Sequence, residues 1–337
     1  MSLAIVGTGL VSPAGLTPRA NACVLWAGAV PASASPFVRG DGEPVPVWYC
    51  PWLGARMSVA DRVLAMGRAA LEHAVGPVRH ALRGTPIPLL LCTPESRAGL
   101  SPPARLRVAA ALAEESTAGD ARVFGGAASF FAALREAEAL LNADAVAVAL
   151  GAVDSYVGEE ALAEHVANPP SPWGAAPPLA EGGAALVVMK AAKARGLGLN
   201  PVGAIHFADT ATGAANDDND LPADGDAMGS LLRRLPPHHA PAPLVFGQFT
   251  TDSLRHAEWQ LAVARNPERV HAEYEMRSFE GELGLVGAAA GGMNLVYGLA
   301  VARHHTTDMP LGGDDPFIAW AVSQDGERGI SLVSKQA

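Results

Sequence analysis

Cysteine side chains are the first candidates for chemistry, because a thiolate is a strong nucleophile where the N-terminus of a helix lowers its pKa. The chain has three cysteines, Cys23, Cys50 and Cys92. Cys92 closes a run of leucines and is predicted to be a buried packing residue. Neither Cys23 nor Cys50 stands between a strand and a helix, and three scattered cysteines are too few for a disulfide framework or a zinc site. No cysteine is therefore predicted to be a nucleophile.

Two histidine pairs and one acidic run could in principle bind a metal ion. The pairs are His238-His239 and His304-His305, and the acidic run is NDDND at residues 216–220. Adjacent histidines point in different directions, and the acidic run lacks the glycine and the closing glutamate of a calcium loop. Residues 7–12 (GTGLVS) contain the first two glycines of a dinucleotide-binding fingerprint but not the third. We expect neither a metal ion nor a cofactor.

The composition narrows the class of protein further. Of 337 residues, 49% are hydrophobic and 17% charged, so the chain can bury a large core. A net charge of −10 argues against nucleic acid and anionic membrane surfaces as partners. The sequence has neither an uncharged apolar run long enough to span a membrane nor the basic start of a signal peptide. These features predict a cytoplasmic protein without a membrane span.

Apolar runs and helical periodicity predict the strands and helices that would position a functional site. Apolar runs bounded by glycine or proline predict strands, and apolar residues three and four positions apart predict helices. Strands separated by helices imply crossover connections and a largely parallel, buried sheet. The predicted strands are residues 4–7, 88–92, 122–124, 145–151, 184–189, 244–246, 317–322 and 330–333, and residues 201–207 form a further apolar segment. The predicted helices are residues 58–75, 104–114, 127–141, 227–235, 253–264 and 285–302.

The same order of elements occurs twice along the chain, divided near residues 192–199. We therefore expect two halves, residues 1–192 and 193–337, packed as one unit. On this pattern alone, a generic doubly wound α/β protein is the alternative.

Five segments of the chain carry a further pattern. They are AIVGTGLVSPAG at residues 4–15, DAVAVALGAVDS at 144–155, EGGAALVVMK at 181–190, LPADGDAM at 221–228 and GLVGAAAGG at 284–292. Taken in this order, the segments resemble the β-ketoacyl synthases of the thiolase-like superfamily. The resemblance implies a duplicated thiolase fold of the α/β class, with five αβαβα layers and two mixed sheets, which usually forms a dimer.

The residue at the family's nucleophile position is not a cysteine. In the family, a cysteine at a strand-to-helix turn attacks the thioester. The spacing of the resemblance places this position at Gly126, which has no side chain to acylate. Ser129 lies one turn further on, and we interpret its hydroxyl as a helix-start group bonded to the backbone rather than as a relocated nucleophile.

The family's two histidines and its lysine are also replaced. Phe246 and Leu285 stand at the two histidine positions and Glu280 at the lysine position, and no histidine or cysteine lies within three residues of Gly126, Phe246 or Leu285. A phenyl ring and an isobutyl group can neither donate a hydrogen bond nor carry a proton. The glycine-rich closing loop of the family is altered at residues 323–329. We expect Phe246 and Leu285 to converge on Gly126 around an apolar pocket.

These substitutions predict a catalytically inactive accessory protein, a pseudoenzyme. The short thiolase-like proteins that accompany type VI secretion effectors are the preferred model, because the chain resembles them in length and in CPWLG at residues 50–54. In that model it is an adaptor or chaperone-like partner of an effector. The second model is the chain-length partner of an active ketosynthase, and either model admits a homodimer.

One alternative and one additional feature stay open. The alternative is an acyltransferase of the β-ketoacyl synthase type, or a hydrolase, with a site rebuilt from Ser129, Gln248, Thr250 and Glu280. The additional feature is the aromatic segment at residues 48–52 (WYCPW), which is either a loop pinned onto the core or an anchor for a partner protein.

Overall fold

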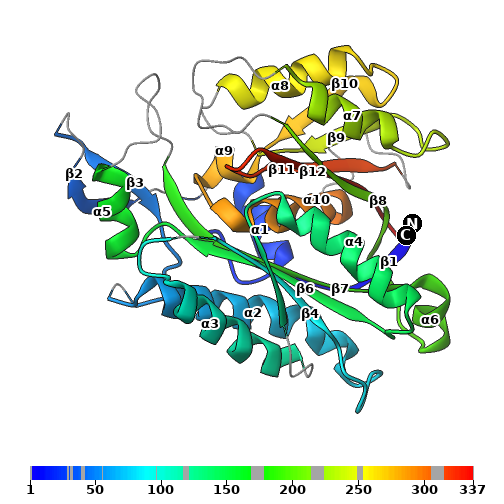
Figure 1. Cartoon of the computed structure of the whole chain (residues 1–337), viewed down its shortest axis with the longest axis horizontal. Helices are drawn as coiled ribbons and strands as arrows, with labels where there is room; N and C mark the ends of the chain where they lie inside the picture. The colour runs from blue at the N-terminus through cyan, green and yellow to red at the C-terminus, as the bar shows by residue number, and fades with distance from the viewer. Residues whose placement is uncertain are drawn as a thin grey trace.

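The structure is a computed structural model of the whole chain (Figure 1). The residues that it describes are 2–28, 30, 33–38, 42–54, 56–95, 97–116, 121–167, 178–213, 224–248, 253–304 and 315–336.

The first half of the strand path is a mixed sheet in the order β1-β7-β6-β4-β5. Strands β4, β5 and β6 are parallel, whereas β7 runs antiparallel to both β6 and β1. Every residue of β4 and β6 is buried, as expected for strands covered on both faces. The bounds are β1 Leu3–Val11, β4 Leu89–Thr93, β5 Ala121–Gly125, β6 Val148–Ser155 and β7 Leu179–Lys190.

The second half of the path repeats this arrangement in the order β8-β12-β11-β9-β10. Here β12 runs antiparallel to both β8 and β11, while β9 is parallel to β11 and β10. The order of strands and their directions therefore match between the two sheets, position by position. The bounds are β8 Gly203–Thr212, β9 Ala242–Phe246, β10 Val270–Arg277, β11 Phe317–Val322 and β12 Glu327–Lys335.

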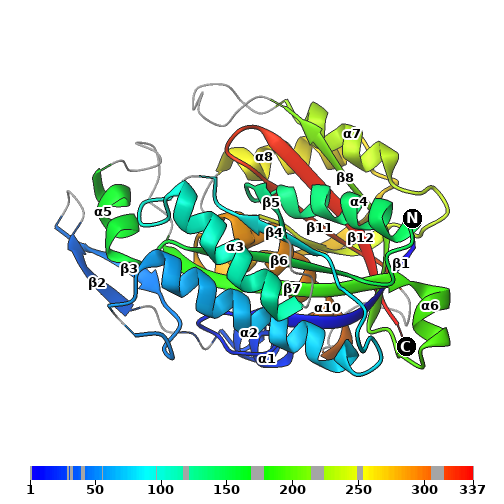
Figure 2. The same ribbon diagram turned by 60° about the horizontal axis from the view of Figure 1, so that its bottom comes forward.

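The helices complete five layers (Figures 1 and 2). Helices α4 (Ser129–Asn142) and α10 (Ala290–His304) lie between the sheets, because each contacts strands of both. Helices α2 (Val59–Arg79) and α3 (Pro102–Ser116) cover the outer face of the first sheet, while α7 (Asp226–Arg234) and α8 (Ser253–Ala264) lie outside the second. This is the expected αβαβα arrangement with two mixed sheets, which join where residues 3–5 of β1 pair with residues 203–205 of β8.

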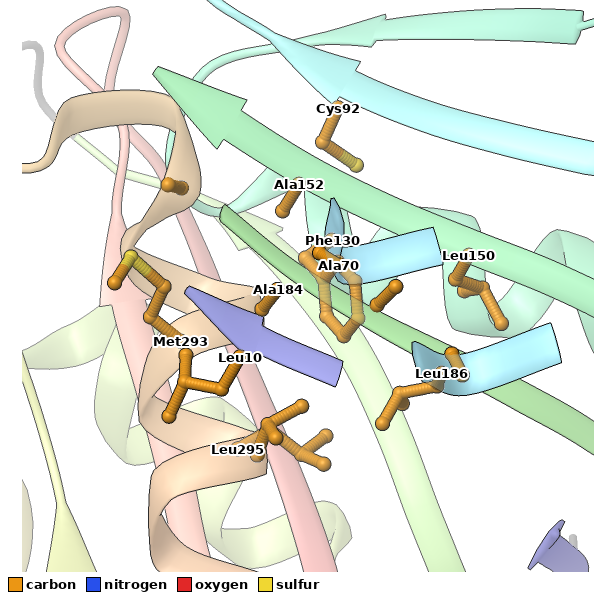
Figure 3. Close-up of a cluster of buried hydrophobic side chains, with 14 of the residues drawn as sticks. Leu10, Ala70, Cys92, Phe130, Leu150, Ala152, Ala184, Leu186, Met293 and Leu295 are labelled. Carbon is orange, nitrogen blue, oxygen red and sulfur yellow. The ribbon is translucent and has the colours of Figure 1, made fainter. Parts of the chain in front are cut away.

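Close packing of small residues holds the layers together. A Cβ at Gly9 in β1 would lie 1.9 Å from the carbonyl oxygen of Ala70 in α2, so only glycine allows this approach. A Cβ at Gly291 in α10 would lie 2.6 Å from the Ala127 carbonyl oxygen, just before α4. Figure 3 shows part of the resulting core, in which Phe130 of α4 lies near Ala152 of β6, and Met293 of α10 belongs to the same cluster of buried side chains.

The remaining elements lie around this frame, and the sequence did not predict most of them. The hairpin β2–β3 and helix α5 form a lobe at one end of the first sheet, where Val47 of β3 pairs with Leu179 of β7 (Figure 1). These elements are α1 Pro18–Trp26, β2 Ser33–Val38, β3 Pro44–Trp48, α5 Glu159–Ala167, α6 Ala191–Gly196 and α9 Phe279–Leu283, with a 3-10 turn at Gly287–Ala289.

The helix expected at residues 285–302 begins five residues later, at Ala290. Gly284 and Gly287 have φ angles of +96° and +51°, so the chain before Ala290 cannot continue as a regular helix. This change moves Leu285 out of the helix.

No helix within the described ranges is long and apolar enough to cross a membrane. No group of three or more potential metal ligands is found in the same part of the chain.

Candidate functional site

Gly126 lies where the sequence placed the nucleophile position, at the turn between β5 and α4. Its φ of +88° belongs to the left-handed region that favours glycine. A Cβ built on Gly126 would lie 2.5 Å from Oγ and 3.0 Å from Cβ of Ser323. The space beside Gly126 is therefore taken by a side chain from the other half of the protein.

Ser323 is held in this place by the N-terminus of α4. The amide of Ala128, which precedes α4, donates to Ser323 Oγ over 2.9 Å. Ala128 itself provides no side-chain cap, and Ser323 satisfies its otherwise free amide. The Ser323 amide in turn donates to the Glu327 carbonyl oxygen at 2.8 Å, so the altered closing loop fixes the serine from the other side.

Ser129 behaves as a structural hydroxyl. Its Oγ donates to the Gly126 carbonyl oxygen over 2.6 Å, and the residue is buried. A hydroxyl in this bond braces the turn.

The buried cysteines are not poised to react. Burial raises the pKa of the Cys92 thiol to about 12, and burial with the nearby Glu181 carboxylate raises that of Cys50. A thiol with such a pKa is protonated at neutral pH, whereas the exposed Cys23 lies on α1, away from the turn at Gly126.

Phe246 ends β9 and packs into the aromatic core. Its ring makes edge contacts with Tyr297 (5.5 Å between centroids) and Phe317 (5.4 Å). A Cβ at Gly298 of α10 would lie 2.7 Å from this ring, so the phenyl group fills the space between β9 and α10. It has no hydrogen-bonding group to offer.

Leu285 lies in the turn that precedes α10. It is half-buried, packs on a small cluster that includes Val47 and Leu179, and exchanges backbone hydrogen bonds with Pro178 and Ala180. No atom of Phe246 or Leu285 lies within 4 Å of the position of a Cβ at Gly126. The side chain nearest to that position is Ser323, and the expected apolar pocket formed by Phe246 and Leu285 around Gly126 stays a prediction.

Glu280, at the lysine position, is a buried carboxyl group on α9. Its Oε1 accepts from the Val286 amide over 3.1 Å, and burial raises its pKa, although nearby Arg255 and contact with Gln248 lower it. Gln248 Oε1 accepts from the Val322 amide at 2.8 Å. A chain of contacts thus leads from Glu280 through Gln248 and Val322 to Ser323. Thr250, the fourth residue of the rebuilt-site alternative, lies outside the described residues.

A second buried polar group lies nearby, and the sequence did not predict it. Asp154, at the end of β6, accepts from Arg97 Nη2 (2.8 Å) and from the Ala288 amide (2.9 Å). The Arg97 guanidinium lies 3.4 Å above the ring of Tyr156. Both of these hydrogen bonds to Asp154 are to Oδ2, while Oδ1 accepts from Arg97 Nε (3.2 Å) and from the Ser155 amide (2.8 Å). Each oxygen of Asp154 is therefore paired, and the group joins β6 to the turn before α10. The one sequence signal for it was an aspartate at the end of an otherwise apolar run.

The aromatic segment at residues 48–52 is pinned to the core. The Cys50 amide donates to Glu181 Oε1 (2.7 Å), which also pairs with Arg62 (2.8 Å) in a buried ion pair. Tyr49 and Trp52 nevertheless keep 42% and 40% of their surface exposed. The segment therefore combines a fixed backbone with two outward aromatic side chains.

The histidine pairs do not form a metal site among the described residues. His239 contacts the rings of both His238 (4.5 Å) and His206 (4.4 Å), and no metal-binding group is found there. Burial, with the neighbouring histidines, lowers the pKa of His206 to about 4. His304 is exposed, whereas His305 and the acidic run at 216–220 lie outside the described residues.

Comparisons with known proteins identify the fold. No family model and no curated sequence matches the chain. Among solved structures, the ishigamide ketosynthase/chain length factor matches with a TM-score of 0.73 and 20% identity, covering 100% of both chains. A type II polyketide synthase acyl-carrier protein complex with its ketosynthase matches with a TM-score of 0.79 and 14% identity, over 100% of this chain and 99% of the other.

A third match is an oxazolomycin ketosynthase domain from Streptomyces albus JA3453, with a TM-score of 0.78, 15% identity and coverage of 100% of this chain and 76% of the other. The chain therefore has the thiolase-like fold of ketosynthases, as the sequence resemblance predicted. At these identities the likeness establishes the fold alone.

Proposed function

We propose that this chain is a catalytically inactive, ketosynthase-like accessory protein that works by binding a second protein. The observation that carries the proposal is the turn at Gly126, where the nucleophile position has no side chain and Ser323 takes up the adjoining space. Acyl transfer through a thioester needs an activated nucleophile there, and decarboxylation needs donors for the developing negative charge. Phe246 and Leu285 supply no donor.

An edge strand supports binding through the first sheet. Strand β5 pairs with β4 on one side and is the last strand of its sheet among the described residues, and its residues are half-buried or exposed. A free edge of this kind invites pairing with another chain. Beside it, a hollow of about 450 Å³ runs along α4 and is lined by Phe124, Ala132, Ala139, Arg135 and Glu136. We therefore place the partner at β5 and α4.

The partner that fits this surface best is a chain of the same fold, either a second copy or an active ketosynthase. A partner with the same edge can pair with β5 about a two-fold or pseudo-two-fold axis. One of the similar structures is a ketosynthase together with a chain length factor. This favours the chain-length-partner model over the type VI secretion adaptor, which rests on the sequence resemblance at residues 50–54.

The proposal of inactivity is tested by incubating the purified chain with malonyl and acyl thioesters. We expect no acyl adduct by intact mass and no release of free thiol above the rate without protein. An active ketosynthase treated in parallel shows that the thioesters react. Turnover by the chain would overturn the proposal.

A rebuilt acyltransferase or hydrolase site is the second candidate, and Glu280 is the observation that favours it. Burial raises the pKa of this carboxyl group, which is a common property of catalytic acids. If the thioester assay shows turnover, Glu280→Gln should abolish it. An exposed glutamate of α2, Glu72, gives the matched control Glu72→Gln, which should leave it unchanged.

A further inference from the structure

All the lysines of the chain lie at one end of the joined sheets. The sequence contains only three, Lys190, Lys193 and Lys335. Lys190 ends β7 opposite Leu3 of β1, and Lys335 ends β12 opposite Gly203 of β8. Since β7, β1, β8 and β12 are consecutive in the strand order and β1 pairs with β8 at these same residues, both lysines lie at the same end of the four strands.

Helix α6 adds two cations at this end. It follows Lys190 directly and carries Lys193 and Arg195, and Figures 1 and 2 both show it next to the beginning of β1. Lys190, Lys193 and Arg195 are exposed, and Lys335 is partly exposed. We call these four side chains the basic surface.

The histidines beside Lys335 report the local electrostatics. His206 Nε2 lies 2.8 Å from Oγ of Ser334, the neighbour of Lys335, and its ring contacts that of His239. Burial first, and then the positive charges of His239 and His238, lower the pKa of His206 to about 4, and no described carboxylate counteracts them. A carboxylate close to His206 would raise this pKa instead. This end of the protein is therefore electropositive, although the whole chain has a net charge of −10.

Structural roles do not explain this gathering of cations. The dipole of α6 favours Lys193 and Arg195 in its last turn, but Lys190 and Lys335 end strands, where no such dipole acts. Neither β7 nor β12 is at a sheet edge, where a lysine would hinder aggregation. No described carboxylate forms an ion pair with the basic surface. Isolated exposed arginines elsewhere also lack such a pair, so the clustering is what distinguishes this end.

We propose that the basic surface binds an acidic segment of a partner protein, a short extended run of aspartate and glutamate residues. Lys190 and Lys335 are three strand spacings apart, roughly 15 Å, which about five extended residues can span. A short segment responds to charges within the Debye length of about 8–10 Å, so the positive field of this end is sufficient to attract it. A long polyanion such as nucleic acid would also meet the negative charge of the rest of the protein.

The basic surface is remote from the turn at Gly126. Strand β12 begins at Glu327, whose carbonyl oxygen accepts from the Ser323 amide beside that turn, and it ends at Lys335. The basic surface therefore lies at the opposite end of β12 from Ser323. Its binding of an acidic segment depends neither on the proposed lack of catalysis nor on pairing through β5.

Fluorescence anisotropy of a labelled decaglutamate peptide, titrated with the full chain at about 20 mM salt, tests the proposal. We expect saturable binding with a dissociation constant of about 1 mM or lower, the scale for about four exposed ion pairs. Raising the salt concentration to about 200 mM should weaken binding at least about tenfold, because salt screens exposed charges. A glycine–serine peptide of the same length should not bind.

The triple variant Lys190→Gln/Lys193→Gln/Lys335→Gln should bind decaglutamate at least about tenfold more weakly. Acetylation of the wild type gives a second measurement, because a bound peptide should slow the modification of the lysines. Since the chain has only three, mass spectrometry of its peptides locates each one. Matching melting temperatures confirm that the variant is folded.

The matched control is Arg19→Gln/Arg56→Gln/Arg107→Gln, which removes three positive charges at exposed positions elsewhere and should bind like the wild type. Equal weakening in the control would overturn the proposal, because overall charge and not the basic surface would then attract the peptide. The absence of saturable binding at low salt would also overturn it. Tighter binding of an oligothymidylate of the same charge would assign the surface to a phosphate polymer and not to a protein segment.

Discussion

Gly126 and Ser323 together decide what can happen at the N-terminus of α4. The helix dipole there would favour a thiolate, but the left-handed φ of Gly126 disfavours any other residue. Ser323 Oγ already accepts the hydrogen bond from the Ala128 amide that could otherwise serve a bound anion. The missing side chain at Gly126 and the occupied end of the helix are therefore two separate features of this turn.

It follows that Gly126→Cys alone will not restore a reactive thiol. The new Cβ would lie 2.5 Å from Ser323 Oγ, and the left-handed backbone costs about 1–3 kcal/mol for a residue with a side chain. We expect this variant to be less stable by at least that amount, whereas Gly126→Cys/Ser323→Gly should recover part of the loss and expose the thiol to iodoacetamide. Urea unfolding and intact-mass measurement of alkylation give the two quantities.

A background of Cys23→Ser removes the exposed native thiol from this assay. On the proposed function, neither variant should decarboxylate a malonyl thioester: losing one oxyanion donor costs roughly 10²–10³ in rate, and Phe246 and Leu285, at the two predicted histidine positions, cannot donate a hydrogen bond. Rapid alkylation of the single variant at wild-type stability would show that Ser323 does not obstruct the position.

The sequence predicted those features of the site that depend on local spacing, and missed those that depend on distant contacts. Spacing along the chain sufficed to place Gly126 at a turn and Ser129 on the backbone. The contact of Ser323 with Ala128 joins residues 195 positions apart, and no local pattern signals it. The turn at Leu285 lies between Gly284 and Gly287, whose positive φ angles the sequence does not specify.

Glu282 should make stability depend on pH. Burial raises its pKa to about 7, although a hydrogen bond from Tyr297 (3.1 Å) and the charge of Arg277 lower it. An unfolded glutamate titrates near pH ~4.3. Because the pKa of Glu282 is higher in the folded protein, folding favours the protonated carboxyl group. The stability that this group contributes is fully present below pH ~4.3 and is lost as the pH rises through about 7.

Glu282→Gln keeps a neutral acceptor for Tyr297 and cannot ionise. Relative to the wild type, we expect it to gain about 1–3 kcal/mol between pH ~4.5 and ~8, after allowance for the partial exposure of the side chain. Urea unfolding of both proteins across this pH range measures the difference in their free energies of unfolding. The contributions of other titrating groups, such as His206, are common to both proteins and cancel in this difference. A constant difference would contradict the assignment.

At the scale of elements, β5 is the strand that the proposed function depends on. Val123 lies in the middle of β5 and is half-buried, and a lysine on a free edge strand hinders pairing with another chain. Val123→Lys should therefore weaken association with a second copy or a ketosynthase at least about tenfold, as measured by light scattering or titration. Leu106→Lys, at a 65% exposed position on α3, is the control and should associate normally.

The central strands were predicted from apolar runs, and the edge elements were not. Strands β4, β6, β9 and β11 are buried throughout, so their sequences are nearly continuous apolar runs. Strand β10 (VHAEYEMR) lies at the edge of its sheet and alternates apolar with polar residues, a period-2 strand signal that a search for continuous apolar runs does not detect. The parallel arrangement expected from crossovers holds for three strands in each sheet, and the antiparallel strands in each follow from the thiolase-like topology.

At the scale of the whole molecule, the two sheets share their central layer. Helix α4 comes from the first half of the chain and packs on β8 and β12, while α10 comes from the second half and packs on β7. The boundary between residues 192 and 193 stays a prediction. Whatever its position, neither sheet can lose its helix without exposing the inner face of the other.

We therefore expect the chain to unfold as one cooperative unit, and a change in the outer layer of the first sheet tests this. Gly9→Ala would place a Cβ 1.9 Å from the Ala70 carbonyl oxygen and should destabilise by at least about 2 kcal/mol through overpacking. Gly76→Ala, in α2 with no atom within 4 Å of the added Cβ, is the matched control and should stabilise by about 0.5–1 kcal/mol.

Hydrogen exchange then compares the amides of β4 and β6 with those of β11 and β12, which belong to the other sheet. Because α4 and α10 join the sheets, Gly9→Ala should lower protection in both by the same free energy, whereas a loss confined to β4 and β6 would mean that the halves unfold separately.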